Sequence, residues 1–568
     1  MAGMNSDKAP AIVILGPGSL ATAQRIQQRY PQARVYGLSG RVEGVEHCYE
    51  SFGDALRGLY REGAPIIALC AAGIVIRTLA PLLDEKGAEP PVLAVAEDGS
   101  AVVPLLGGLS GVNVMAREIG EVLGVAAAIT TSGELRFGTC LLNPPTGYAL
   151  ADLEQGKRFV SDLLAGESVR IEGVAPWLAQ AQLPEDAAAR RSIHVGWQAR
   201  PASRDELLIH VRSVLVAVDV VQPDLPARVR AALAAANIAE ASLACLLAGE
   251  DDMAEPALHE AARELGVPLR FASSRSSLAE MATQALDGAQ VIEQCGLAIA
   301  VTPSPIVPQQ VGRLRGRLAV IGLGPGAADL MVPAVKAELA RAEDVLGYET
   351  YVRMAGPFRA DQVLHCTDNR EEMQRARHAF ELAAQGRSVV VVSSGDPGVF
   401  AMAAAVLEAL HESSDPAWHR VDLQILPGVS ASLATAAQAG APLGHDFCVM
   451  SLSDNLKPWS IIEKRLDLAA QADLVLAFYN PISKSRPHQL GVALEVVRRH
   501  RQGNTPVVLG RDIGRPGQTL KVVTLAELLP EMVDMRTMVL VGSSTTCCID
   551  KVGGGRWVYT PRWYGRDS

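Results

Sequence analysis

The chain has 568 residues, of which 49% are hydrophobic and 20% charged, and its formal net charge is −10 at pH 7. This length predicts roughly four domains, and an acidic chain without a basic stripe excludes nucleic acid as the expected partner. No run of about eighteen apolar residues is present, which excludes a membrane-spanning helix.

The amino terminus and the cysteines indicate where the protein works. The first residues, MAGMNSDKAP, lack the apolar stretch of a signal peptide. The nine cysteines are scattered without the spacing of a zinc or iron–sulfur ligand set. We therefore expect a cytoplasmic protein with free thiols and no metal site.

Residues 1–90 predict a small α/β domain. Short apolar strands are expected at 11–15, 35–38 and 66–70, and the last leads into a helical pattern at 71–83. The run Gly16-Pro-Gly18 could be taken for a phosphate-binding loop, but it lacks the lysine and the hydroxyl of one. A tight turn is the favoured interpretation.

Residues 91–204 predict a central domain followed by a linker. Strands are expected at 92–96, 102–106 and 125–130. From 151 to 204 the pattern loses its regularity, with Pro176, Pro184 and the run DAAARR. We expect this stretch to be a linker with short helices.

Residues 205–301 predict a third α/β domain, and residues 302–316 a second linker. The domain is expected to begin with one strand over 207–220 and to continue with helices at 225–237, 254–265 and 276–284 and strands at 238–246 and 267–272. The second linker is rich in proline and arginine, a composition typical of semi-rigid exposed segments.

Three segments of this half resemble the cobalt-precorrin-5A hydrolase family: GIVIRTLAPLLDEKG at 73–87, LLGGLSGVN at 105–113 and ITTSGE at 129–134. The resemblance implies a histidine where Leu109 stands, a threonine–aspartate pattern where Ser132–Glu134 stands and a glycine–cysteine turn where Asp219–Gln222 stands. A leucine can neither activate water nor stabilise an oxyanion. We therefore favour a non-catalytic precorrin-binding module, with an active lactone hydrolase, and hence a bifunctional chain, as the alternative.

Residues 317–444 predict a mostly parallel α/β lobe with two glycine turns. A strand at 318–321 is closed by GLGPG at 322–326, and the strand VVVV at 389–392 delivers SSGDPGVF to its carboxyl end, where open α/β sheets bind ligands. Pro325 removes a backbone donor, which argues against a pyrophosphate-binding dinucleotide loop. We expect a ligand without phosphates, with the Asp396 carboxylate accepting hydrogen bonds from its hydroxyl or amino groups.

Residues 445–568 predict a second α/β lobe. Its strands are expected near 447–452, 474–479, 507–510, 521–524 and 538–542. A cofactor would lie in the cleft between the two lobes.

Four motifs of these lobes resemble the tetrapyrrole methylase family in order and spacing: GLGPG, SSGDPGVF at 393–400, PGVSA at 427–431 and AFYNP at 477–481. TDNREE at 367–372, GAPLGHDFCVMSLSDNLKPW at 440–459 and MRTMVLVGSS at 535–544 are similar to its precorrin-3B C(17)-methylating members. The resemblance implies a two-lobed α/β fold with S-adenosylmethionine in the cleft, and a homodimer formed through these lobes. It covers about residues 316–561.

The resemblance also implies individual site residues. The cofactor contacts it implies are Pro325, Ser394, Gly395, Asp396, Val399, Phe400, Ser430, Ala431, Tyr479, Asn480, Thr537 and Met538. An acidic chain needs local positive charge to bind a polycarboxylate, and the candidates are Arg370, Lys457, Arg465, Lys484, Arg486, Arg511 and Arg515. The substrate-binding set that we predict is Arg370, Asp454, Asn455, Lys457 and Arg511. Asp368, His445, Asp446 and Asp454 could each take a proton from the substrate, and none is assigned as catalytic.

The expected function is methylation of precorrin-3B at carbon 17 with ring contraction to precorrin-4, in cobalamin biosynthesis. A precorrin methyltransferase that acts at another carbon is the alternative. The expected partners are the small-molecule precorrin and other enzymes of the same pathway.

Overall fold

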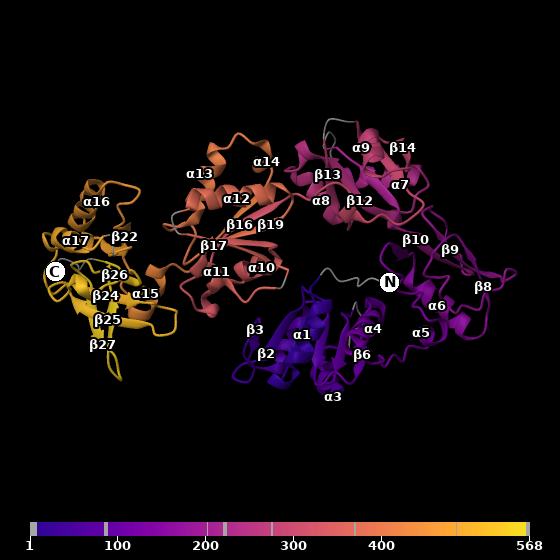
Figure 1. Ribbon diagram of the computed structural model, residues 1–568, viewed down its shortest axis with the longest axis horizontal. Helices are drawn as coiled ribbons and strands as arrows, with labels where there is room; N and C mark the ends of the chain where they lie inside the picture. The colour runs from indigo at the N-terminus through magenta and orange to yellow at the C-terminus, as the bar shows by residue number, and fades with distance from the viewer. Residues whose placement is uncertain are drawn as a thin grey trace. The chain divides into compact units, whose positions relative to one another are not determined.

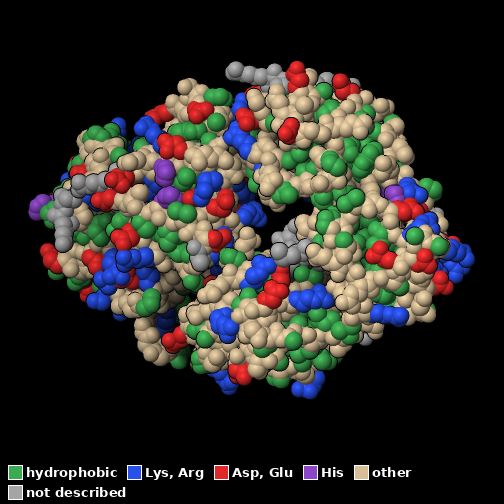
Figure 2. All heavy atoms as spheres, turned by 45° about the vertical axis from the view of Figure 1, so that its right-hand side comes forward, with side chains coloured by type: hydrophobic (Ala, Val, Ile, Leu, Met, Phe, Trp, Pro, Cys, Tyr) green, Lys and Arg blue, Asp and Glu red, His purple; other side chains and the backbone are tan. Residues whose placement is uncertain are grey.

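The computed structural model describes residues 8–83, 89–201, 203–219, 224–273, 277–359, 361–368, 371–483 and 486–563. The chain forms two compact units, Met1–Arg315 with Pro357–Asp361, and Gly316–Gly356 with Gln362–Ser568. Both units consist of helices packed on β-sheets (Figure 1). Among the described residues, the helices are too short or too polar to span a membrane. Basic and acidic side chains are interspersed over the face drawn in Figure 2.

The first sheet has the strand order β3-β2-β1-β4-β5-β6, in which only β6 is antiparallel to its neighbour. Its elements are β1 (Ala11–Ile14), α1 (Leu20–Arg29), β2 (Arg34–Leu38), β3 (His47–Tyr49), α2 (Phe52–Arg61), β4 (Ile66–Leu69), α3 (Ala72–Leu79), β5 (Val92–Val95), β6 (Val102–Leu106) and α4 (Val112–Leu123). Ile12 and Ile14 of β1 face α1 and α4, whereas Ala11 and Val13 face α2 and α3. Because β4 pairs with β5, the sheet continues past the boundary predicted at residue 90.

The strand predicted at 125–130 does not form. Only one isolated bridge, between Val102 and Ala127, joins this segment to β6 among the described residues. Pro104 of β6 has no backbone N–H, so it cannot donate to a further strand at that edge.

The linker predicted at 151–204 is instead part of a second domain. Its sheet has the order β7-β10-β9-β8, and the phenylalanines of its helices, Phe137 and Phe159, are buried against Ile193 and Ile209. The elements are α5 (Ser132–Phe137), β7 (Tyr148–Leu150), α6 (Leu153–Leu164), β8 (Val169–Glu172), β9 (Arg191–Gly196) and β10 (Glu206–Val211).

The single strand predicted over 207–220 is divided between two sheets. Its first part is β10, and after Arg212 and the fully buried Ser213 its second part, β11 (Val214–Ala217), enters the third sheet of the unit. That sheet has the order β13-β12-β11-β15-β14. The other elements are α7 (Leu225–Ala235), β12 (Leu243–Gly249), α8 (Pro256–Glu264), β13 (Leu269–Ala272), α9 (Leu278–Ala285), β14 (Gln290–Gln294) and β15 (Leu297–Val301).

The linker predicted at 302–316 is only partly exposed. Ile306 and Val311 are buried. Arg313 exchanges two backbone hydrogen bonds, each of 2.9 Å, with Phe271 of β13. This segment therefore packs on the third domain of the first unit.

The second unit begins with a parallel sheet of order β18-β17-β19-β16-β20. Helices α12, α13 and α14 lie on one side of it and α10 and α11 on the other (Figure 1). The elements are β16 (Arg317–Gly322), α10 (Pro333–Arg341), β17 (Asp344–Tyr348), α11 (Glu349–Ala355), β18 (Val363–Thr367), α12 (Glu372–Ala384), β19 (Ser388–Ser393), α13 (Met402–Glu412), α14 (Pro416–His419) and β20 (Asp422–Leu426). The confirmed parallel order places the carboxyl ends of β19, β16 and β20 side by side.

The second lobe contains a mixed sheet of order β22-β23-β26-β24-β25 and a small sheet of order β21-β28-β27. Helix α15 precedes the boundary predicted at residue 444 but packs on this lobe through Ala436 and Ala439. The elements are α15 (Ala431–Ala439), β21 (Gly440–Ala441), β22 (Phe447–Ser451), α16 (Trp459–Gln471), β23 (Val475–Tyr479), α17 (Gln489–Arg498), β24 (Pro506–Arg511), β25 (Thr519–Thr524), β26 (Thr537–Val541), β27 (Cys547–Asp550) and β28 (Arg556–Tyr559). The hairpin of β27 and β28 was not predicted.

Candidate functional site

Three glycine turns meet at the carboxyl edge of the first-lobe sheet. They follow β16, β19 and β20, which are neighbours in the sheet. The Gly324 N–H donates to the Gly395 carbonyl oxygen at 3.1 Å, and the Gly395 N–H donates to the Gly324 carbonyl oxygen at 2.8 Å. The two turns predicted to form the site are therefore joined directly by their backbones.

The close approach of these turns requires glycine. A Cβ atom on Gly322 would lie 2.8 Å from the Gly428 nitrogen and closer still to the Gly395 carbonyl oxygen. A Cβ atom on Gly428 would lie 2.7 Å from the Gly322 carbonyl oxygen. These contacts are with backbone atoms, which cannot rotate away, so neither position has room for a side chain.

The Asp396 carboxylate fastens two of the turns together. Its Oδ1 accepts the Gly398 N–H at 2.8 Å, and its Oδ2 accepts the Gly428 N–H at 3.0 Å. Both oxygens thus have backbone donors in addition to any ligand. The sequence predicted Asp396 as an acceptor for a ligand, and the structure gives its side chain this second, positioning role.

The second lobe contributes to the same edge through the start of α15 and the end of β23. The Tyr479 hydroxyl accepts the Ser432 N–H at 3.1 Å, while the Ser430 hydroxyl caps α15 by accepting the Leu433 N–H at 3.4 Å. The Tyr479 ring lies 5.4 Å from the ring of Phe400. Phe400 has a positive φ of 53° and remains half exposed at the edge of the turn.

Arg515 connects the hairpin turn between β24 and β25 to two of the glycine turns, those after β16 and β19. Its Nε donates to the Pro325 carbonyl oxygen at 3.0 Å, and its Nη2 donates to the Ser394 hydroxyl at 3.3 Å. A Cβ atom on Gly326 would lie 2.6 Å from the Cγ of Arg515. Arg515 was one of seven carboxylate-binding candidates, and its contacts give it a role in holding the turns.

The structure thus brings together most of the residues predicted to contact a cofactor. Those at or beside the three turns are Pro325, Ser394, Gly395, Asp396, Val399, Phe400, Ser430, Ala431 and Tyr479. Asn480, which follows Tyr479, turns away to donate to the Ser451 hydroxyl at 3.1 Å. Thr537 and Met538 are buried: Thr537 bonds to Asp534 at 2.7 Å, and Met538 lies in the core behind Ala431 and Tyr479.

The predicted substrate-binding residues do not all lie at the glycine turns. Arg370 lies outside the described residues. Lys457 places its Nζ 5.8 Å from the centre of the Phe400 ring, and Asp454 accepts a hydrogen bond from Gln489 at 3.2 Å. Asn455 is exposed.

Arg511 is already paired within the second lobe. It donates to Asp534 at 2.8 Å and to Asp512 at 2.9 Å, and the hydrogen bond from its side chain to Asp534 raises the pKa of Arg511. Burial alone would raise the pKa of Asp534, but hydrogen bonds from Thr537 and Arg511 hold it below its ordinary value. Arg511 is therefore a poorer candidate for a substrate carboxylate than an arginine without such partners.

The chemistry of this edge suits a donor such as S-adenosylmethionine. Phe400 and Leu433 expose apolar surface beside the hydroxyls of Ser394 and Ser430. Pro325 offers no N–H, and the Asp396 carboxylate adds negative charge, so the edge is poor in donors for a phosphate. A cationic ligand with an apolar base and a polar amino-acid part fits these groups.

In the first unit, the residues aligned with the hydrolase signature are engaged with one another. Glu134 is only 4% exposed, accepts the Asn113 amide at 2.9 Å and pairs with Arg117. Leu109 is exposed in a short turn between Gly107 and Gly111, both of which have positive φ. A buried, paired carboxylate is a poor general base for water, and leucine offers no replacement.

One group of possible metal ligands occurs among the described residues, also in the first unit. The ligand atoms of Glu172, His194 and Glu206 lie within 4.8 Å of one another, on β8, β9 and β10 respectively. The guanidinium of Arg200 lies 2.7 Å from His194 Nδ1 and 3.0 Å from Glu206. Arg200 thus supplies the positive charge there, and the absence of a metal site stays a prediction.

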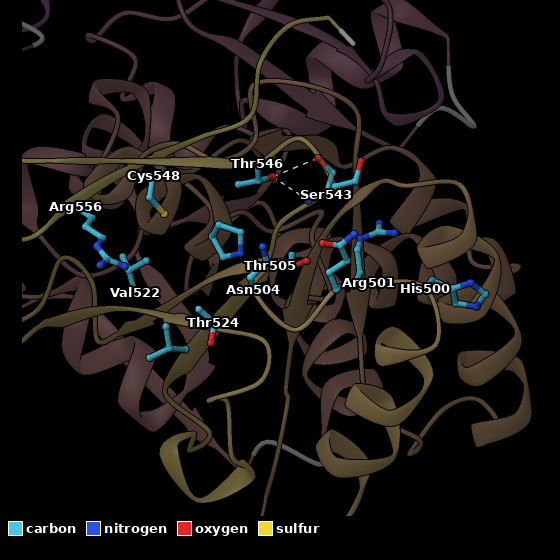
Figure 3. Close-up of a pocket in the computed structure, with 14 residues that line it drawn as sticks. His500, Arg501, Asn504, Thr505, Val522, Thr524, Ser543, Thr546, Cys548 and Arg556 are labelled. Atoms are coloured by element: carbon cyan, nitrogen blue, oxygen red, sulfur yellow. Dashed lines mark hydrogen bonds between the residues drawn. The ribbon is translucent and has the colours of Figure 1, made fainter. Parts of the chain in front are cut away.

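A cavity of about 460 Å³ lies in the second lobe, at the sheet edge opposite to Tyr479 and Arg511 (Figure 3). It is lined by His500, Arg501, Gln502, Asn504, Thr505, Pro506, Val522, Val523, Thr524, Ser543, Ser544, Thr546, Cys548 and Arg556. No sequence pattern predicted it.

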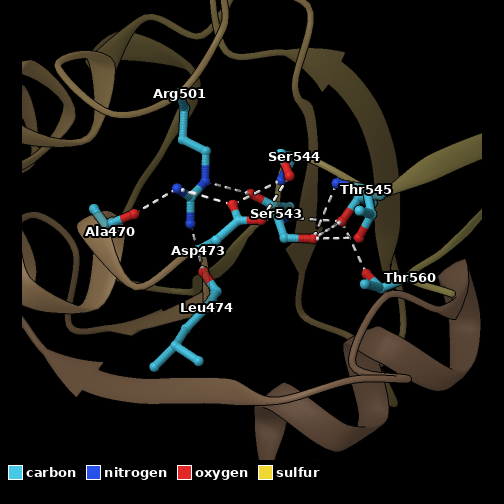
Figure 4. A network of polar contacts seen from close by, with 10 residues as sticks. Ala470, Asp473, Leu474, Arg501, Ser543, Ser544, Thr545 and Thr560 are labelled. Carbon is cyan, nitrogen blue, oxygen red and sulfur yellow. Dashed lines mark hydrogen bonds and ion pairs between the residues drawn. The ribbon is translucent and has the colours of Figure 1, made fainter. Parts of the chain in front are cut away.

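A buried polar network beside this cavity is centred on Arg501 (Figure 4). The side chain of Arg501 is 2% exposed; it donates to the carbonyl oxygens of Ala470 and Leu474, the latter at 2.9 Å, and pairs with Asp473 at 3.1 Å. Asp473 in turn accepts the N–H of Ser544 at 2.9 Å. The network therefore ties the end of α16 to the turn after β26.

Comparison with known proteins defines the class first. Residues 317–529 match the family described as Tetrapyrrole (Corrin/Porphyrin) Methylases, and residues 54–134 match Cobalamin synthesis G N-terminal. A relative from Sinorhizobium sp, named precorrin-3B C(17)-methyltransferase, is 49% identical over 255 residues, which are 45% of this chain and all of that protein. The chain therefore belongs to the tetrapyrrole methylases, and it is an S-adenosylmethionine-dependent methyltransferase. Both resemblances drawn from the sequence are confirmed.

The comparisons also include a second sequence relative and a solved structure. Cobalamin biosynthesis protein CobIJ of Mycobacterium tuberculosis (strain ATCC 25618 / H37Rv) is 48% identical over 255 residues, which are 44% of this chain and 49% of that protein. A solved structure titled as that of the methyltransferase CobJ is 54% identical, covers 43% of this chain and all of that chain, and has a TM-score of 0.41.

Replacing Arg515 by alanine is expected to weaken binding of S-adenosylmethionine about tenfold, because its 3.0 Å hydrogen bond to Pro325 is worth about 1.5 kcal/mol and the 3.3 Å contact with Ser394 is long and adds little. Isothermal titration calorimetry on the full chain measures this. Lys521→Ala removes an exposed cation from the adjacent strand β25 and should leave the affinity unchanged. Equal affinities for Arg515→Ala and the wild type would show that the arginine does not position the turns.

Proposed function

We propose that the chain transfers the methyl group of S-adenosylmethionine to carbon 17 of precorrin-3B, with ring contraction to precorrin-4, in cobalamin biosynthesis. The observation that carries this proposal is the 49% identity to the precorrin-3B C(17)-methyltransferase of Sinorhizobium sp across that protein's whole length. The convergence of three glycine turns at one sheet edge supports the same reading.

When bound, S-adenosylmethionine supplies an activated methyl group, so the chain needs no nucleophile of its own. The task of its residues is orientation, which alone contributes large rate factors. Asp396 and Arg515 hold the turns in register, and Tyr479 and Phe400 line the adjoining surface. The proposed cofactor contacts are the nine residues at or beside the turns that were named above, the first of which is Pro325 and the last Tyr479.

Ring contraction also requires loss of a proton from the hydroxyl at carbon 20. His445 Nδ1 accepts the Asp446 N–H at 2.8 Å, and Asp454 is bonded to Gln489. Asp368 directly follows β18. None of these contacts singles out one group as the base, and we assign none.

The test is an assay of purified full-length chain with labelled S-adenosylmethionine and precorrin-3B, with and without cobalt, followed by mass spectrometry. One new methyl group at carbon 17 in a contracted ring supports the proposal. Methylation at another carbon would overturn it. Turnover only of the cobalt-loaded substrate would favour the reaction named for the probable cobalt-factor III C(17)-methyltransferase of Salmonella typhimurium, which is 39% identical over 247 residues.

For residues 1–301 we propose a non-catalytic precorrin-binding module. The burial and pairing of Glu134 and the leucine at position 109 support this proposal over an active lactone hydrolase. A homodimer through the methylase lobes, a cytoplasmic location and contacts with other pathway enzymes are further proposals. Exposed Ile549 and Trp557 on the hairpin of β27 and β28 offer apolar surface for a second copy.

Incubation of the full chain with a lactone-containing cobalt-precorrin is expected to release no acetaldehyde above the buffer blank. The reason is that neither Leu109 nor the paired Glu134 can activate water. Acetaldehyde can be trapped and quantified by mass spectrometry. Stoichiometric release by the wild type, lost in Glu134→Gln, would establish the bifunctional alternative instead.

A further inference from the structure

Arg486 is buried in a way that its own lobe does not explain. It lies in the segment between β23 and α17 and is only 8% exposed. Its Nε and Nη1 atoms are buried and have no hydrogen-bond partner. Its backbone is fixed, because its N–H donates to the Ser483 carbonyl oxygen at 3.0 Å and its carbonyl oxygen accepts the Ser483 N–H at 3.2 Å.

A buried guanidinium without acceptors carries a large desolvation cost. Buried charges in native proteins are normally paired with a carboxylate or bonded to several acceptors. The ion pairs and hydrogen bonds recorded among the described residues include no acceptor for the Arg486 side chain. Its position therefore indicates an acceptor from outside the chain, and a carboxylate is the strongest match to a guanidinium.

A second buried polar atom without a hydrogen-bond partner belongs to Gln489, three residues further along the chain. The Gln489 Oε1 is buried without a partner, while its Nε2 donates to Asp454 Oδ2 at 3.2 Å. The amide is held in this orientation because the carboxylate can only accept. Its oxygen is then available to accept an N–H. A ligand that fits both groups carries a carboxylate and a hydrogen-bond donor.

Hydrogen-bonded segments of the second lobe connect these groups to the proposed methyl-transfer site. The segments after β22 and β23 are joined by hydrogen bonds from Asn480 to Ser451 and from Gln489 to Asp454. The same strand β23 ends in Tyr479, which touches Phe400 of the cofactor turn. Lys457, on the segment after β22, lies over the same Phe400 ring.

We propose that Arg486, with Gln489 beside it, forms a subsite for one carboxylate side chain of the acidic tetrapyrrole substrate. This inference rests on the proposed function, since a precorrin carries both carboxylates and ring N–H groups. The proposal favours Arg486 over Arg511 as the residue that binds a substrate carboxylate, because the Arg511 guanidinium already donates to Asp512 and Asp534. A substrate carboxylate at this position would hold the macrocycle against the second lobe.

The test compares Arg486→Gln with the control Arg499→Gln, which removes an exposed arginine just after α17. The full chain is assayed for KM and kcat with precorrin-3B and for S-adenosylmethionine affinity by calorimetry. Arg486→Gln is expected to raise KM about tenfold or more, as loss of a charge-assisted pair predicts, and to leave cofactor affinity within about twofold. Arg486→Lys should recover part of the loss. An unchanged KM for Arg486→Gln would overturn the subsite.

Two further measurements complete the test. The first detects a purely structural role of Arg486, and the second tests the subsite even if the proposed reaction is wrong. Removal of an unpaired buried charge should not speed hydrogen exchange in peptides that cover α17, and clearly faster exchange there would overturn the inference by revealing a partner within the protein. If the wild type fails to methylate precorrin-3B, the proposed function falls, and the subsite is judged by binding of cobyrinic acid and its methyl ester. A preference of the wild type for the free acid, lost in Arg486→Gln, supports the subsite; equal binding of acid and ester overturns it.

Discussion

Alanine at position 396 is expected to reduce S-adenosylmethionine affinity and methyl transfer about a hundredfold or more, since two hydrogen bonds to an ionised group, at about 1.5–3 kcal/mol each, are lost together. The Asp396 carboxylate accepts the N–H groups of Gly398 and Gly428, which belong to two different turns. Without it, the turn after β20 is no longer fastened to the turn after β19. Calorimetry gives the affinity, and the labelled-methyl assay gives the rate.

Two matched variants sharpen this experiment. Asp396→Asn keeps one acceptor oxygen but presents an amide N–H₂ to the second backbone donor, so an intermediate loss is expected. Asp415→Ala removes a carboxylate that also accepts a backbone N–H, that of Ala417 at 2.8 Å, but at the start of α14 away from the turns. It should cost about 1 kcal/mol of helix stability and leave cofactor affinity intact. If Asp396→Ala bound S-adenosylmethionine with the wild-type affinity, the Asp396 carboxylate would have no part in the cofactor site.

Replacing Arg501 by methionine is expected to destabilise the second lobe by about 3–5 kcal/mol, the usual cost of breaking a buried ion pair from one side. The partly buried Asp473 would lose its cationic partner, and the carbonyl oxygens of Ala470 and Leu474 would lose their donor in the interior. Because the chain has several domains, a single unfolding transition is not expected. Hydrogen exchange resolved by peptide measures the local effect instead.

The exchange experiment has a clear internal reference. Faster exchange is expected in peptides covering the end of α16 and the turn after β26, with peptides of the first unit unchanged. Arg499→Met replaces a neighbouring exposed arginine and should leave the pattern as in the wild type. Equal protection of these peptides in Arg501→Met and the wild type would contradict the account of the network.

The glycine turns could be predicted because their signals are local. A short β-branched strand, a glycine run and a helical pattern follow one another within about a dozen residues, and Pro325 by itself argued against a phosphate loop. What holds the turns together could not be predicted in this way. The contact of Arg515 with Pro325 joins residues 190 positions apart, and that of Asp396 with Gly428 joins residues 32 positions apart. Neither leaves a periodic trace in the sequence.

The errors in the first unit have the same physical origin. The stretch 151–204 was taken for a linker because β7 and β8 have only three and four residues and are partly exposed, so neither shows a strong apolar pattern. Their strand character comes from pairing with β10 and β9. The boundaries of short strands are set by partners, and local composition alone does not reveal them.

The division of one apolar run between β10 and β11 limits how the amino-terminal half can be dissected. A fragment that starts at residue 205 would carry β10 away from β7 and β9, the strands on either side of it. The part left behind would lack the middle of its sheet, and the new fragment would display an unpaired strand that invites association with other chains. Experiments on these domains therefore call for a cut after Val211, or for the intact chain.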